Sequence, residues 1–256
     1  ADSGYEIKEF NEVADVYVIN TCSVTNMGDR KSRQIIRRAK KLNPNAVIAV
    51  TGCYAQTAPD EVLAIEGVNL VLGTKDRKNI VTLVEEINTE SNINHVSDIM
   101  SNHEFEELQI KQYSNRTRAF IKIQEGCNQF CSYCIIPYAR GPVRSRAKDD
   151  VVREIKELAH NGFKEIILVG IHVASYGVDL GDTTLESLIM DVDKIDGVER
   201  IRLSSIEPMT LNQEFIDSIK DSKKLCHHFH ISLQSGCDET LKRMNRKYTT
   251  AQFKGI

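Results

Sequence analysis

Three cysteines in one short loop are the clearest chemical feature of the sequence. Cys127, Cys131 and Cys134 lie within eight residues, directly after a run of apolar and β-branched residues. Cysteine thiolates are the usual ligands of iron–sulfur clusters. Three of them can each bind a different iron of one cubane, so the fourth iron stays open for another ligand. A structural zinc ion is the alternative, but it normally needs four ligands, and the sequence offers no fourth ligand nearby.

Two stretches of alternating strand and helix patterns must position this loop. In the first, strands are expected at 16–19, 47–50 and 69–72, and helices at 29–42, 59–65 and 79–87. In the second, strands are expected at 119–124, 165–169, 200–203 and 229–233, with helices at 149–161, 185–195 and 211–219 and another from Asp238. The alternation predicts two α/β units with mostly parallel sheets. Residues 89–117 between them are polar and are interpreted as a linker that can carry one edge strand.

Bulk composition limits the class of protein. The 256 residues have 41% hydrophobic and 27% charged side chains, which suits one large domain or two modest ones. There is no apolar run long enough to span a bilayer, and residues 1–8 lack the layout of a signal peptide. We therefore expect a cytoplasmic monomer. Seven cysteines, an odd count, fit a disulfide framework poorly in that reducing compartment.

Two clusters of positive charge stand out against a net charge of -3. The first cluster lies on one expected helix: Arg30, Lys31, Arg33, Arg37, Arg38, Lys40 and Lys41. The second follows the cysteine loop: Arg140, Arg144, Arg146 and Lys148. A charged helix is usually only a solvated face, but acidic residues are not interleaved after Asp29. An RNA backbone would supply the missing negative charge.

The spacing C-x3-C-x2-C, with Tyr133 before the last cysteine, resembles the signature of the radical S-adenosylmethionine (SAM) superfamily. The resemblance implies that Cys127, Cys131 and Cys134 hold a catalytic 4Fe–4S cluster whose open iron binds SAM. It also implies that one electron passed into the sulfonium releases a 5′-deoxyadenosyl radical. This is cofactor chemistry, for which the protein supplies position and shielding.

Residues 20–25, 51–55 and 125–146 resemble the methylthiotransferases of this superfamily. The resemblance implies a Rossmann-like parallel α/β N-terminal domain over residues 1–88. A partial (β/α)6 TIM-like barrel with its first four βα units would then cover residues 118–256. The family's first strand, its last barrel units and its C-terminal TRAM domain are expected to be missing. We therefore expect this chain to be truncated at both ends and impaired in activity.

The same resemblance gives the remaining cysteines their expected roles. Cys22 and Cys53 resemble two of the three ligands of an auxiliary 4Fe–4S cluster, whose first cysteine is missing here. The simpler interpretation of these two is a small buried residue at a strand end. Cys226 and Cys237 lie outside any ligand spacing and are interpreted as structural.

Small and polar residues at or near the expected strand ends resemble the SAM-contacting elements of the family. Alone, each is more often a turn or cap residue, but carboxyl ends of parallel strands meet at one edge. His172 is a weaker candidate at the same edge. The residues expected to contact SAM are Tyr133, Gly170, Ser204, Ser205, Glu207, Gln234, Ser235 and Arg243.

The segments 24–34 and 135–146 resemble the branch that adds a methylthio group to C2 of threonylcarbamoyl-adenosine in the anticodon loop of tRNA. Arg30, Lys31, Arg33, Arg37, Arg38, Arg140, Arg144 and Arg146 are expected to contact this RNA. The resemblance implies two SAM molecules, a flavodoxin- or ferredoxin-type electron donor and a sulfur donor. Alternatives are a methylthiotransferase acting on isopentenyl-adenosine or on a ribosomal-protein aspartate, and a non-catalytic RNA-binding protein with zinc.

Overall fold

A computed structural model of the chain describes residues 3–23, 26–107 and 117–256. It divides into two compact units, which are taken separately below. The first unit comprises Ala1–Asn102 and Cys134–Gly141, and the second comprises His103–Tyr133 and Pro142–Ile256. The division therefore falls inside the cysteine loop, between Tyr133 and Cys134. No helix among the described residues is both long and apolar enough to cross a membrane.

The first unit is built on a four-stranded parallel sheet in the order β1-β2-β3-β4. Its elements are β1 Val16–Thr21, α1 Asn26–Leu42, β2 Val47–Gly52, α2 Cys53–Thr57, α3 Pro59–Leu63, β3 Leu70–Leu72, η1 Arg77–Asn79, α4 Ile80–Glu85, β4 Ile93–His95, η2 Ile99–Ser101 and α5 Ile136–Arg140. Strand β4 lies in the expected linker and extends the sheet beyond β3. The parallel α/β pattern predicted for this part of the chain is confirmed.

Helix α1 shows why this unit forms from its sequence. Ser32, Ile36 and Ala39 are buried and recur at the spacing of one helical face. Ile36 and Ala39 share a core with β1 and β2, to which Ile19, Ile48 and Val50 contribute. The opposite face carries the basic residues, so the charge pattern and the apolar pattern of this helix occupy different sides.

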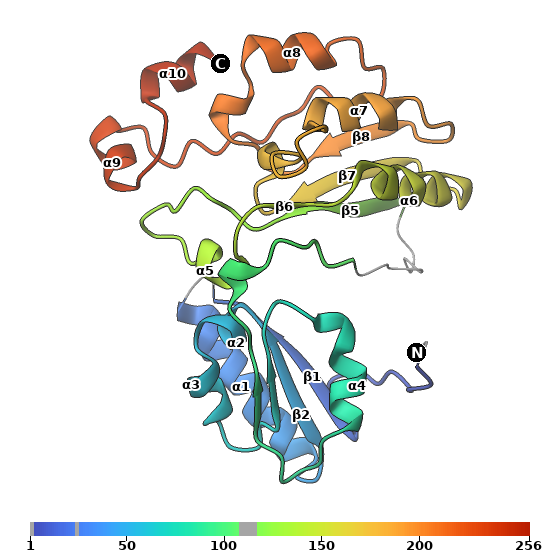
Figure 1. Ribbon diagram of the computed structural model, residues 1–256, viewed down its shortest axis with the longest axis vertical. Coiled ribbons are helices and arrows are strands. Elements are labelled where there is room, and N and C mark those ends of the chain that lie inside the picture. Colours follow the sequence, from blue (N-terminus) through green and yellow to red (C-terminus); the bar gives the residue numbers. More distant parts are fainter. Residues whose placement is uncertain (1–2, 24–25, 108–116) are drawn as a thin grey trace. The chain divides into compact units, whose positions relative to one another are not determined.

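The second unit has a sheet in the order β6-β5-β7-β8, in which only β6 is antiparallel. Its elements are β5 Arg118–Glu125, β6 Arg144–Ser145, α6 Lys148–His160, β7 Glu165–Gly170, η3 Val173–Ser175, α7 Leu185–Asp193, β8 Arg200–Leu203, η4 Pro208–Thr210, α8 Gln213–Ile219, α9 Asp238–Arg243 and α10 Thr250–Gly255. Helices alternate with the parallel strands, and their apolar faces form one core with β5, β7 and β8. This is the expected partial (β/α) barrel, with its strands curling in one direction (Figure 1).

The strand predicted at residues 229–233 is wrong. The segment 229–233 carries one isolated parallel bridge, Ile206 with Ile231, and the chain before it carries another, Ile201 with Leu225. The chain from Leu225 to Ile231 is one residue longer than the chain from Ile201 to Ile206 that it runs beside. The extra residue interrupts the regular pairing, as a β-bulge does. The fourth βα unit therefore has an irregular path in place of a regular strand.

Candidate functional site

The cysteine loop begins two residues after β5 and is tied to the turn that follows α9. Ser132 donates from its backbone N to the Met244 carbonyl at 3.1 Å and from its hydroxyl to the Arg243 carbonyl at 2.8 Å. The Asn245 side chain donates to the Phe130 carbonyl at 2.9 Å. These three bonds fix the backbone around Cys131, so its sulfur has a defined position.

Backbone strain gathers at the same place. Among the described residues, four that are not glycine have a positive φ, and three of them are Phe130, Gln234 and Asn245. Phe130 and Asn245 are joined by the hydrogen bond above, and the Tyr133 hydroxyl donates to the Gln234 side chain at 3.1 Å. Such conformations cost about 1–3 kcal/mol each and cluster at functional sites. Tyr133 and Gln234, two residues expected to contact SAM, are thus brought together.

Arg246 is the central side chain of this region, and the sequence analysis missed it. Its Nη1 donates to the Cys131 sulfur at 3.3 Å, and its Nη2 donates to Glu207 at 2.6 Å. Burial lowers the pKa of the Arg246 guanidinium, but the Cys131 hydrogen bond and the Glu207 charge outweigh this and raise it above its ordinary value. Arg243, the arginine expected to contact SAM, is exposed, and its backbone carbonyl accepts the hydrogen bond from the Ser132 hydroxyl. A second basic residue three positions after Arg243 was the only signal for Arg246 in the sequence.

The carboxyl ends of β7 and β8 contribute the next residues. The His172 Nε2 lies 3.8 Å from Glu207, and the His172 backbone N donates to the buried Gln124 side chain at 2.8 Å. A Cβ on Gly170 would lie 2.8 Å from Gln124 Oε1, so glycine is needed for this close approach. Arg246 therefore links Cys131 of the loop to Glu207, and Glu207 in turn lies beside His172 at the other strand end.

The remaining candidates lie around the same strand ends with different exposure. The Ser204 hydroxyl oxygen is buried, and no described residue hydrogen-bonds to it. Ser205 is exposed, and its hydroxyl lies 2.7 Å from His230 Nδ1. Ser235 is half-buried, and its hydroxyl accepts from the Cys237 backbone N at 3.2 Å. Of these three residues, only Ser204 has a buried group that is open to a ligand.

Cys22 and Cys53 lie side by side in sequence register, each directly after the last residue of one of two adjacent strands, β1 and β2. Thr21 and Gly52 are paired with each other in β1 and β2. Cys22 follows Thr21 directly, and Cys53 follows Gly52 directly. Gly52 has φ 102°, and a Cβ there would lie 2.3 Å from the Thr21 carbonyl oxygen. Glycine is therefore required where the two strand ends come closest. Cys22 is exposed and Cys53 is buried.

The two other cysteines do not resemble one another. Cys226 is half-buried beside β8, where its backbone N donates to the Ile201 carbonyl at 2.9 Å. Cys237 is exposed at the N-cap of α9, so it is not a buried packing residue as interpreted from the sequence. Hydrogen bonds from Thr240 and Glu239 lower the pKa of the Cys237 thiol.

The basic face of α1 is exposed as expected. Arg30, Lys31, Arg37 and Lys41 are exposed, and within the described part of the chain none of them has a carboxylate partner. Arg33 and Arg38 instead lie over the rings of Tyr54 and Phe10, respectively. The helix therefore presents a stripe of uncompensated charge.

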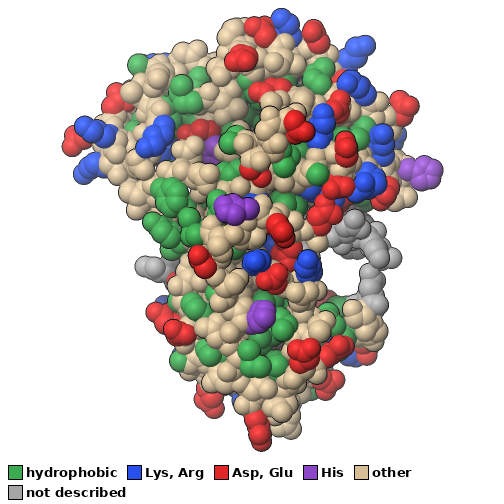
Figure 2. Space-filling view, in the orientation of Figure 1, with side chains coloured by type: hydrophobic (Ala, Val, Ile, Leu, Met, Phe, Trp, Pro, Cys, Tyr) green, Lys and Arg blue, Asp and Glu red, His purple; other side chains and the backbone are tan. Residues whose placement is uncertain are grey.

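The cations after the cysteine loop are placed differently from the expectation. Arg144 is 2% exposed and faces the buried carboxylate of Glu125, 4.0 Å away. Arg146 is also buried and pairs with Glu107 and Glu154. An RNA phosphate cannot reach groups that are buried and already paired, so the predicted RNA contact of these two arginines does not fit. On the second unit, the face shown in Figure 2 has cations and anions side by side.

Two protein families match different parts of the chain. Residues 121–256 match the radical SAM superfamily, and residues 1–73 match the uncharacterized protein family UPF0004. The first match covers more than half of the chain and includes the whole cysteine loop. The chain belongs to the radical SAM superfamily. Membership implies SAM and 4Fe–4S cofactors, as expected from the cysteine spacing.

Relatives of this radical SAM protein are known in bacteria. The threonylcarbamoyladenosine tRNA methylthiotransferases MtaB of Bacillus subtilis and Aquifex aeolicus are 50% and 42% identical to it, over 98% and 99% of this chain. The chain spans 56% and 62% of their lengths. A tRNA-2-methylthio-N(6)-dimethylallyladenosine synthase of Thermoanaerobacter pseudethanolicus is 39% identical over 98% of this chain and is covered to 54%.

A solved structure supports the fold of this radical SAM protein. The radical SAM methyltransferase TsrM of Kitasatospora setae superposes with a TM-score of 0.64 over 95% of this chain and 54% of its own. The sequence identity is 15%, so this likeness concerns the fold alone.

The residues present fit the cofactors that the superfamily implies. Cys127, Cys131 and Cys134 are half-buried free thiols, and a guanidinium lies against one of them. Three buried polar atoms without a hydrogen-bond partner among the described residues, Ser204 Oγ, His172 Nε2 and Arg246 Nε, can serve a polar ligand at the strand ends. Within the described residues, no three His, Cys, Asp or Glu side chains converge on a single metal ion. A cubane holds each thiolate on a separate iron, so it does not require such convergence.

Proposed function

We propose that the protein is a methylthiotransferase that acts on C2 of threonylcarbamoyl-adenosine beside the anticodon of tRNA. The observation that carries this proposal is the identity of 50% and 42% to two enzymes of that name over nearly the whole chain. Because the chain spans 56–62% of those enzymes, the activity is proposed for the full-length protein. The cysteine loop and the strand-end residues supply the matching chemistry.

In this proposal each group of cysteines has its own task. Cys127, Cys131 and Cys134 would hold the cluster that binds SAM, and Cys22 and Cys53 would be two ligands of an auxiliary cluster. When bound, the cluster and SAM supply the radical chemistry that removes hydrogen from the adenine carbon. Arg246 holds Cys131 and Glu207 in place, and Ser204 Oγ and His172 Nε2 accept or donate hydrogen bonds to the bound cofactor.

The exposed basic residues of α1 supply the RNA contact in this proposal. Arg30, Lys31 and Arg37 lie on one side of the helix without carboxylate partners in the described chain, so phosphate groups would compensate their charge. The protein would act in the cytoplasm as a monomer, with an electron donor of the flavodoxin or ferredoxin type and a separate sulfur donor.

A second candidate function is methylthio transfer to isopentenyl-adenosine. It is favoured by the 39% identity to a synthase named for the dimethylallyl nucleoside. The threonylcarbamoyl group carries a carboxylate, whereas the isopentenyl group is apolar, so a basic surface favours the first substrate. The two substrates differ in mass and are separable by nucleoside analysis.

Nucleoside analysis of bulk tRNA from a deletion strain tests the proposal. The deletion should abolish the methylthio form of threonylcarbamoyl-adenosine, and the full-length gene should restore it. The variant Cys131→Ala should fail to restore it, whereas the control Cys226→Ala should succeed. Loss of the methylthio isopentenyl nucleoside would favour the second candidate. Unchanged tRNA would refute both and direct attention to a protein aspartate.

A further inference from the structure

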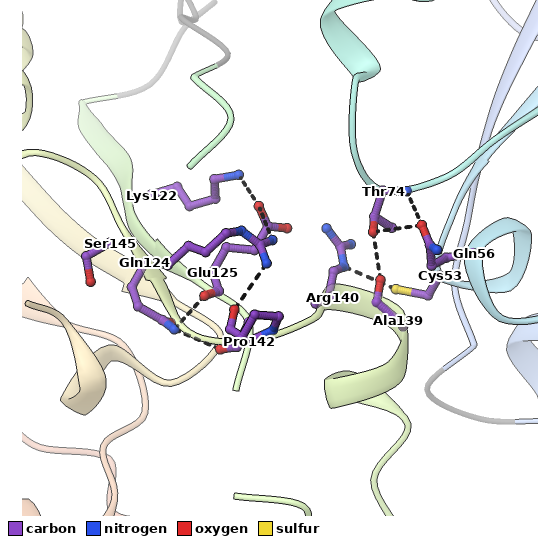
Figure 3. A network of polar contacts seen from close by, with 12 residues as sticks. Cys53, Gln56, Thr74, Lys122, Gln124, Glu125, Ala139, Arg140, Pro142 and Ser145 are labelled. Carbon is purple, nitrogen blue, oxygen red and sulfur yellow. Dashed lines mark hydrogen bonds and ion pairs between the residues drawn. The ribbon is translucent and has the colours of Figure 1, made fainter. Parts of the chain in front are cut away.

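Arg140 makes a contact that neither RNA binding nor the SAM cluster explains. It is the last residue of α5, and its Nε donates to the sulfur of Cys53 at 3.3 Å (Figure 3). Cys53 is the first residue of α2 and is 4% exposed. A guanidinium that aims its N–H at a buried sulfur resembles the second layer of hydrogen bonds around metal ligands.

The position of Arg140 is fixed by its neighbours in the first unit. The carbonyl of Ala139, the preceding residue, accepts from the Thr74 hydroxyl at 2.7 Å. The Thr74 backbone N donates to the Gln56 side chain at 2.8 Å, and Gln56 lies on α2, the helix that begins with Cys53. A closed frame therefore runs from Cys53 through Gln56, Thr74 and Ala139 back to Arg140. All of these bonds lie within one compact unit.

Because of these hydrogen bonds, the position of Arg140 is poorly explained by binding of an RNA phosphate. Its Nε is committed to a sulfur and its side chain is partly buried, whereas Arg30, Lys31 and Arg37 on α1 are exposed. Hydrogen bonds to the sulfurs of an iron–sulfur cluster and the net charge around it set its reduction potential. A donor that also carries positive charge favours the more negative, reduced cluster.

We propose that Arg140 is a positioning residue for the cluster held by Cys53, and that it raises the reduction potential of that cluster. The inference rests on the proposed role of Cys53 as an auxiliary-cluster ligand. One segment, Cys134–Gly141, then serves both metal sites: its first residue binds the SAM cluster, and its arginine tunes the auxiliary cluster. The reductant is the one-electron donor that the proposed function already requires.

The test isolates the auxiliary cluster in the full-length protein by the triple variant C127A/C131A/C134A. After anaerobic reconstitution this background should keep about four irons per chain, and its midpoint potential is measured by a spectroscopically monitored redox titration. Adding Arg140→Gln should shift the potential to more negative values. Arg140→Lys, which keeps the charge but loses the Nε donor, should give a smaller shift. Thr74→Val, which releases Ala139 without touching the sulfur, should shift the potential in the same direction.

The control is Arg153→Gln, an exposed arginine on α6 whose partner is Asp150, and it should leave the potential unchanged. Circular dichroism confirms that each variant is folded. Iron retained with the same potential in the Arg140 variants and the control would overturn the inference and leave the proposed function standing. Absence of iron from the triple-variant background would refute the role of Cys53, and with it this inference.

Discussion

The guanidinium of Arg246 joins the Cys131 sulfur to the Glu207 carboxylate, with a 3.3 Å bond to the first and a 2.6 Å bond to the second. It thereby ties the cysteine loop to the end of β8 through a residue that follows α9. The cysteine loop, the end of β8 and the turn after α9 are far apart in the sequence and are joined by this one side chain. The stability of the protein should therefore depend on it.

Arg246→Gln is expected to destabilise the protein markedly. The side chains of Arg246 and Glu207 are 8% and 12% exposed, and removing one partner of a buried pair costs about 3–5 kcal/mol. Arg243→Gln, three residues earlier and exposed, should change the free energy of unfolding by no more than about 0.5 kcal/mol. Urea unfolding of both variants tests this difference, and equal losses would contradict the role given to Arg246.

Gly52→Ala should destabilise the first unit more than strain alone predicts. Gly52 and Gly162 have similar φ values of 102° and 91°, but only Gly52 has atoms where a Cβ would lie. Gly162→Ala should cost about 1–2 kcal/mol for the left-handed conformation. Gly52→Ala should cost about 1–3 kcal/mol more because of the added clash. Thermal and chemical unfolding measure both costs. Similar losses of unfolding free energy in the two variants would show that the ends of β1 and β2 move apart to admit the added Cβ.

Removing charge from α1 should weaken RNA binding in a salt-dependent way. Arg37→Ala removes an exposed cation, and if it meets one phosphate of a single-stranded loop, the slope of log K against log salt should fall by about 0.7. Lys194→Ala removes an exposed cation that already pairs with Asp191 and should leave the slope unchanged. Binding of a tRNA transcript across a salt series measures both slopes. Equal slopes in both variants would exclude Arg37 from the RNA contact.

Glu165 should contribute to stability only above acidic pH. The Arg200 hydrogen bond lowers the pKa of Glu165 below 4.5, burial opposes this shift, and Arg202 adds to it. Because the folded pKa is the lower one, the stabilisation is present above 4.5 and is lost as the pH falls through the folded pKa. Glu165→Gln should therefore be less stable than the parent by about 1 kcal/mol or less at neutral pH. Unfolding free energies over a pH series should converge at the acidic end, and a constant gap would contradict the assignment.

The sequence was sufficient for the features that depend on local periodicity. Strand β8 at Arg200–Leu203 and the placement of the cysteine loop after β5 follow from short apolar runs and flanking polar residues. The role of Arg246 could not be predicted, because its partners are set by the turn after α9, which brings it to residues 115 and 39 positions away. The burial of Arg144 was missed for a similar reason, since its partner Glu125 lies on a neighbouring strand.

The segment Cys134–Gly141 lies within the residues that match the radical SAM superfamily, yet it belongs to the compact unit formed mainly by the first 102 residues. The two halves of the gene are therefore not interchangeable modules. A chimaera of two related enzymes joined in the polar stretch at 89–117 would set the α5 of one parent against the α2 of the other. To keep the Ala139–Thr74 anchor native, a designed fusion must transfer residues 134–141 together with the first half.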